Sequence, residues 1–109
     1  MWNEIQDTLN LLDMTIKEAK EHGYAMNLAE VHYYSVKDQE LSELAEKGVS
    51  ATLAKETIKG KPRVNDALLD FRNKQIDYDN AREGINAYKL RIRVLEAQLE
   101  REWSQAKRM

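Results

Sequence analysis

The chain has 109 residues, a net charge of −2, 33% charged and 42% hydrophobic residues, and no cysteine. This length suits a single domain, the composition favours helices over disorder, and disulfides and thiolate metal sites are excluded. No signal-peptide pattern opens the chain and no apolar run reaches the ~20 residues that span a bilayer. We therefore expect a cytoplasmic protein with no membrane contact.

The first half of the chain predicts two helices, over residues 2–22 and 25–47. Apolar residues recur at intervals of three and four, as on one face of a helix. In the first helix this face holds Trp2, Ile5, Leu9, Leu12, Ile16 and Ala19. In the second it holds Met26, Ala29, Tyr33, Val36, Leu41 and Leu44, with a five-residue step after Val36 that interrupts the rhythm. Gly23 either ends the first helix or bends it, and Gly48 is expected to end the second.

A short connecting helix is predicted over residues 51–59. Ser50 is a good N-cap for it, Gly60 is expected to cap its end, and Pro62 prevents simple continuation. A structured loop is the alternative for this segment.

The last helix, predicted over residues 63–107, carries the strongest pattern. With Val64 as position a of a seven-residue repeat, every later a position is apolar, and most d positions are, Lys74 and Glu102 being exceptions. Such a repeat predicts a coiled coil. Its predicted packing seam consists of Val64, Phe71, Tyr78, Ile85, Tyr88, Ile92, Leu95 and Leu99. Gly84 lies outside the seam and is expected to mark the close approach of another helix.

The two halves have matching helical lengths, roughly 70 Å at about 1.5 Å per residue, and this predicts an all-α antiparallel hairpin. Leu90, Val94 and Ala97 are expected beside the main stripe, where they would widen it. A wide stripe needs more than one partner helix, which a three-helix fold or self-association would supply. We favour self-association into a homo-oligomer.

No motif in the sequence predicts catalysis, a cofactor or a metal site. Lys59-Gly60-Lys61-Pro62 lacks the second glycine and the hydroxyl residue of a phosphate-binding loop. His22 and His32 are ten residues apart and would not share one helix face. Ser50, Thr52 and Lys55 have no base and orienting group at fixed spacing. We therefore expect a protein that is not an enzyme.

Charge is unevenly distributed along the chain. Residues 1–23 and 24–48 each carry −3, whereas residues 49–62 and 63–109 each carry +2. The C-terminal third contains candidate nucleic-acid contacts, namely Lys89, Arg91, Arg93, Arg101, Lys107 and Arg108. The alternative is that these residues flank the seam and pair with Glu96, Glu100 and Glu102.

Two stretches of the chain carry a family resemblance. Residues 46–55 with residues 59–62, and residues 81–103 with their Glu-Arg-Glu-Trp ending, resemble small uncharacterised α-helical proteins of phages and prophages of Gram-positive bacteria. The likeness covers about residues 24–103. It implies a phage-encoded protein acting in the cytoplasm of the bacterial host, near phage replication and recombination functions.

Three functions follow as hypotheses. The first is a non-enzymatic helical interaction protein that contacts itself or a protein partner, as an accessory to phage DNA replication or recombination. The second is a nucleic-acid-binding accessory protein that uses the basic C-terminal third. The third is an inhibitor of a host protein whose acidic N-terminal half mimics nucleic acid.

Overall fold

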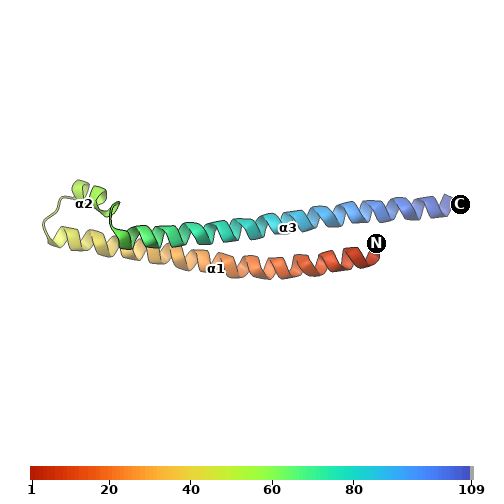
Figure 1. Cartoon of the computed structure of the whole chain (residues 1–109), viewed down its shortest axis with the longest axis horizontal. Coiled ribbons are helices and arrows are strands. Elements are labelled where there is room, and N and C mark those ends of the chain that lie inside the picture. Colours follow the sequence, from red (N-terminus) through yellow and green to blue (C-terminus); the bar gives the residue numbers. More distant parts are fainter. Residues whose placement is uncertain (109) are drawn as a thin grey trace. The chain divides into compact units, whose positions relative to one another are not determined.

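The computed structural model describes residues 1–108 and contains three helices and no strand in that range. They are α1 (Trp2–Glu46), α2 (Ala51–Ile58) and α3 (Pro62–Arg108), shown in Figure 1. The all-α prediction is confirmed. Within residues 1–108, no helix is long and apolar enough to cross a membrane.

The chain packs as two compact units. The connector unit is His22–Tyr78, in which the end of α1 and the start of α3 run antiparallel and α2 joins them. The terminal unit is formed by Met1–Glu21 and the described part of Asp79–Met109, again with the α1 and α3 stretches antiparallel. The connector unit is thus a helical hairpin, and the terminal unit is an antiparallel pair of helix segments from α1 and α3.

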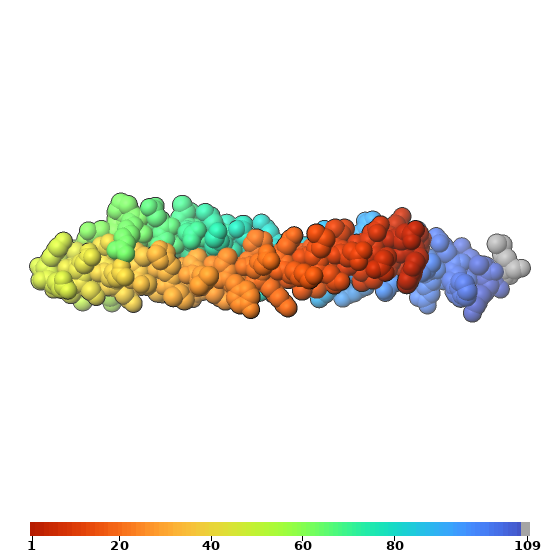
Figure 2. Space-filling view, turned by 90° about the horizontal axis from the view of Figure 1, so that it is seen from below, coloured from red at the N-terminus to blue at the C-terminus, as the bar shows by residue number. Residues whose placement is uncertain are grey.

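In the terminal unit, α3 extends past the first residue of α1 (Figures 1 and 2). Every described side chain from Glu100 to Lys107 is exposed. Glu102 and Ala106 are the repeat positions in this stretch, and they are exposed because no part of α1 faces them.

Helix α1 is a single helix, so the predicted break between residues 22 and 25 does not exist. Gly23 neither adopts a positive φ nor ends the helix. A Cβ added to Gly23 would lie 3.4 Å from Cε2 of Tyr78, which shows that the Tyr78 ring packs directly on the bare backbone. The packing offsets the ~1 kcal/mol that a glycine costs inside a helix.

The end of α1 forms a Schellman motif, as the glycine at position 48 predicts. Gly48 has a φ of 80°, its N–H donates to the Ala45 carbonyl, and the Val49 N–H donates to the Leu44 carbonyl. Val49 also packs on a cluster that contains Leu44, which is the apolar contact typical of this motif.

Helix α2 begins as predicted, with the Ser50 Oγ accepting a hydrogen bond from the Leu53 N–H. Its end differs from the prediction, because φ at Gly60 is not positive. The turn instead uses bonds from the Gly60 and Lys61 N–H groups to the carbonyls of Thr57 and Ile58. Helix α3 then starts at Pro62, whose missing N–H is not needed at a first helical position.

The buried side of α1 follows a seven-residue rhythm in which some positions are polar. Thr8 is 3% exposed and Glu40 is 9% exposed, whereas Trp2 is 66% and Leu9 37% exposed. The prediction that Trp2 and Leu9 belong to the packing face is therefore wrong. Thr8 can be buried because its hydroxyl donates to the Glu4 carbonyl, so no polar atom is left unsatisfied.

Candidate interaction surfaces

The predicted seam of α3 faces α1 inside the two units. Val64, Ile92 and Leu95 are buried. The remaining seam residues are half-buried, namely Phe71, Tyr78, Ile85, Tyr88 and Leu99. In the connector unit, the Phe71 ring stacks on Tyr33 with centroids 6.5 Å apart. This apolar side is therefore already covered within one chain.

Gly84 lies where α1 and α3 approach each other closely in the terminal unit. A Cβ added to it would lie 3.4 Å from Cγ2 of Thr15. Thr15 satisfies its own hydroxyl by donating to the Leu11 carbonyl at 2.8 Å, which leaves its methyl group for packing. The expectation that Gly84 marks the close approach of another helix is confirmed, and the helix is α1.

The five-residue step in the apolar rhythm of α1 is filled by a carboxylate. Glu40 lies at the buried position between Val36 and Leu44, and Arg63 Nη1 approaches its Oε1 to 3.6 Å. The same guanidinium donates to the side-chain oxygen of Gln39. No sequence pattern pointed to this pair, because Arg63 comes from α3 and only the fold brings it beside Glu40.

The outer side of α3 in the terminal unit carries a second apolar series. We call it the outer stripe; it consists of Ala87, Leu90, Val94 and Ala97, all exposed, with Leu90 at 59% and Val94 at 55%. The prediction that these residues widen the seam is wrong. Leu90 lies two residues from both Tyr88 and Ile92, and two residues on an α-helix turn the side chain by about 200°. The stripe therefore faces away from α1.

The predicted nucleic-acid contacts are exposed at Lys89, Arg91, Arg93, Arg101 and Lys107. The side chain of Arg108 lies outside the described residues. None of these five exposed cations forms an ion pair within 4.0 Å with any described residue, so the predicted pairing with Glu96, Glu100 and Glu102 is not seen. Lys107 instead lies 5.6 Å from the centroid of the Trp103 ring. These cations are distributed around the helix and form no single strip.

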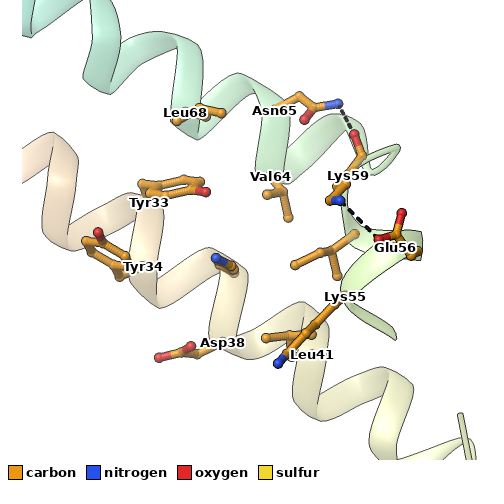
Figure 3. Close-up of a pocket in the computed structure, with 12 residues that line it drawn as sticks. Tyr33, Tyr34, Asp38, Leu41, Lys55, Glu56, Lys59, Val64, Asn65 and Leu68 are labelled. Atoms are coloured by element: carbon orange, nitrogen blue, oxygen red, sulfur yellow. Dashed lines mark hydrogen bonds and ion pairs between the residues drawn. The ribbon is translucent and has the colours of Figure 1, made fainter. Parts of the chain in front are cut away.

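A cleft of about 730 Å³ lies in the connector unit, between α1, α2 and the start of α3. Tyr33, Tyr34 and Asp38 line it from α1, Lys55 and Glu56 from α2, Lys59 from the turn after α2, and Asn65 and Leu68 from α3 (Figure 3). No sequence pattern pointed to this cleft, because its lining comes from three helices that only the fold brings together.

The serine and the two histidines considered above for catalysis or metal binding occupy structural positions on the helices. Ser50 is engaged as the N-cap of α2, and His22 and His32 lie half-buried and exposed, respectively, on α1. Within residues 1–108, no three His, Asp or Glu side chains gather closely enough to hold a metal ion. The surfaces suited to function are therefore the outer stripe, the exposed cations and the cleft.

Comparison of the chain with protein-family models, with curated protein sequences and with solved structures finds no match.

Proposed function

We propose that this chain is a non-enzymatic helical interaction protein that works by pairing helices, first of all with a second copy of itself. The observation that carries the proposal is the outer stripe. Its members recur at intervals of three, four and three residues, which is the spacing that one helix presents to another. Leu69 and Ile76 repeat the position of Leu90 at multiples of seven residues and are 59% and 55% exposed.

A second copy suits the outer stripe because the stripe is self-complementary. It reads Ala, Leu, Val, Ala, so an antiparallel copy sets Leu90 beside Val94 of the other chain and Ala87 beside Ala97. A two-fold interface uses the same patch on both chains in this way. The small residues at both ends allow the two helices to approach closely.

The expected association is weak. Leu90 and Val94, the two large side chains of the stripe, are each about half exposed, so the apolar surface that a second copy can bury is small. Because association itself costs several kcal/mol, we expect a dimer only at high protein concentration.

The phage context of the proposal is supported by the resemblance of residues 24–103 to small helical proteins of phages and prophages. In that setting the protein acts in the host cytoplasm as an accessory to phage DNA replication or recombination. Its protein partner is to be identified by co-purification from the bacterial host.

The test is the mass of the chain in solution as a function of concentration. Light scattering between about 10 μM and 1 mM should show the mass of the wild type rising toward that of two chains. Leu90→Lys should keep the mass of one chain, because each lysine would bring a charge against Val94 of the other copy, while helicity stays unchanged. Gln75→Lys adds the same charge at an exposed position of α3 outside the stripe and should associate like the wild type. A wild type of constant single-chain mass, or a Leu90→Lys variant that still associates, contradicts the proposal.

Nucleic-acid binding is the second candidate, and it is favoured because the five exposed cations from Lys89 to Lys107 form no ion pair with any residue in the described part of the chain. Lys89 and Arg93 are four residues apart and so lie on one side of α3. If they bind phosphates, a short DNA duplex should bind at about 50 mM salt and be released at about 200 mM. The double variant Lys89→Glu, Arg93→Glu should abolish the complex. No complex at the lower salt concentration removes this candidate.

A further inference from the structure

The cleft of the connector unit lies between two separate hydrophobic clusters. One contains Val36, Val64 and Ala67, with Tyr33 packed against it. The other contains Leu44, Ala54 and Ile58, with Leu41 and Val49 packed against it. Tyr33 and Val64 from the first cluster and Leu41 and Ile58 from the second all line the cleft, and Leu68 completes its apolar surface. Ile58 and Val64 are almost fully covered by their clusters, at 3% and 4% exposed. The apolar surface that remains open to the cleft therefore comes from the half-buried Tyr33, Leu41 and Leu68.

The α2–α3 turn holds this opening in place. The Gly60 and Lys61 N–H groups donate to carbonyls of α2 at 3.1 and 3.0 Å, and the Asn65 side chain donates to the Lys59 carbonyl at 3.1 Å. Three hydrogen bonds across one short turn fix α2 against the start of α3. The cleft is therefore formed before any ligand arrives, which lowers the entropic cost of binding.

The rim of the cleft carries an excess of positive charge. Its cations are Lys37, Lys55 and Lys59, and its carboxylates are Asp38 and Glu56. Lys59 Nζ forms an ion pair with Glu56 Oε1 at 3.1 Å, so the negative charge of Glu56 already has a cationic partner (Figure 3). Lys37 lies 5.9 Å from the centroid of the Tyr33 ring. Neither Lys37 nor Lys55 forms an ion pair with any residue that the structure describes.

We propose that this cleft is the docking site for an acidic amphipathic helix of a partner protein. Its bulky apolar side chains would pack on Tyr33, Leu41 and Leu68. Its carboxylates would meet Lys37 and Lys55. An apolar surface with cations on two sides is what such a helix requires. A nucleic-acid backbone fits less well, because the apolar surface of the cleft offers its phosphates no partner.

This inference rests on the proposed function, in that it names the chemistry of the protein partner, but it uses a different surface from the outer stripe. The probe is a synthetic helical peptide of about four turns with leucines at positions i, i+3, i+4 and i+7 and glutamates on both flanks. A twin peptide carries lysine in place of every glutamate. Binding is followed through backbone amide NMR signals of the labelled full chain.

The glutamate peptide should shift the amide signals of Lys37, Lys55 and Ile58 saturably, and the lysine peptide should not. Lys55→Glu should weaken binding about tenfold, since it replaces an attraction with a repulsion. Arg72→Glu makes the same reversal at an exposed residue of the connector unit that does not line the cleft. It should bind the peptide as the wild type does.

Absence of saturable shifts at the cleft, equal binding of both peptides, or equal losses in Lys55→Glu and Arg72→Glu would each overturn the proposal. Shifts caused by a DNA duplex but not by the glutamate peptide would also overturn it. The titration is repeated on Leu90→Lys. That variant should bind the glutamate peptide with the affinity of the wild type. Loss of peptide binding at the cleft and loss of self-association are therefore observed separately.

Discussion

Gly48 and Gly84 both lack a side chain, but for different physical reasons. Gly48 has a φ of 80° and nothing within 4 Å of an added Cβ, so the backbone conformation demands glycine there. Gly84 has ordinary helical geometry, and an added Cβ would meet Thr15 Cγ2 at 3.4 Å, the start of normal contact distance. One glycine is needed for its conformation, whereas the other is only near a neighbour.

The same substitution at these two glycines should therefore act in opposite directions. Gly48→Ala should lower the free energy of unfolding by about 1–2 kcal/mol, because an L residue is strained at positive φ. Gly84→Ala should raise it by up to about 1 kcal/mol, because alanine is the better helix former and its methyl group fits. Urea denaturation followed by circular dichroism measures both. If both variants changed the free energy of unfolding in the same direction, this account of the two glycines would be wrong.

Single residues also show where sequence reasoning succeeds and where it fails. Gly48 and Ser50 were predictable because capping depends on backbone groups only a few residues away. Thr8 and Glu40 were not, because residue type alone places them on the surface. Their burial depends on a hydroxyl that bonds back to α1 and on Arg63, contributed by α3.

Helix α3 has two apolar sides with different roles, and substitutions on them should separate folding from assembly. Ile92, 8% exposed, belongs to the seam against α1, whereas Ile76, 55% exposed, points outward. Both are isoleucines of the same helix, which makes them a matched pair.

Ile92→Asp should cost at least about 3 kcal/mol, because it removes buried apolar surface and places a charge in the seam. Ile76→Asp should cost less than about 1 kcal/mol, as is usual for exposed positions. Thermal unfolding followed by circular dichroism compares the two at equal protein concentration. Comparable losses of stability would contradict the division of α3 into an inner seam and an outer side.

Helix α1 shows that a glycine inside an apolar repeat does not by itself end a helix. The repeat continues on both sides of Gly23, and Tyr78 packs on the gap that the missing side chain leaves. From the sequence, a bend and a break were equally acceptable at this position. The choice was made by an aromatic ring more than fifty residues away.

At the scale of the whole molecule, the candidate surfaces belong to different units. The outer stripe lies in the terminal unit and the cleft lies in the connector unit. The stripe residues stand out in the sequence as apolar positions on a polar helix, although the side of α3 on which they lie was predicted wrongly. The cleft has no sequence signal, because its cations are ordinary surface lysines until α2 folds over α1.

The sequence by itself determined that the chain is helical, where α2 and α3 begin, how α1 ends, and which residues of α3 repeat every seven positions. Those properties depend on helical periodicity and on hydrogen bonds between near neighbours. Only the tertiary structure decided that α1 is one helix, that Thr8 and Glu40 are buried, which apolar side of α3 stays open, and that a cleft exists. Each of these depends on which side chains a second helix places opposite a residue. Those side chains come from distant parts of the chain, so the residues near a position in the sequence do not reveal them.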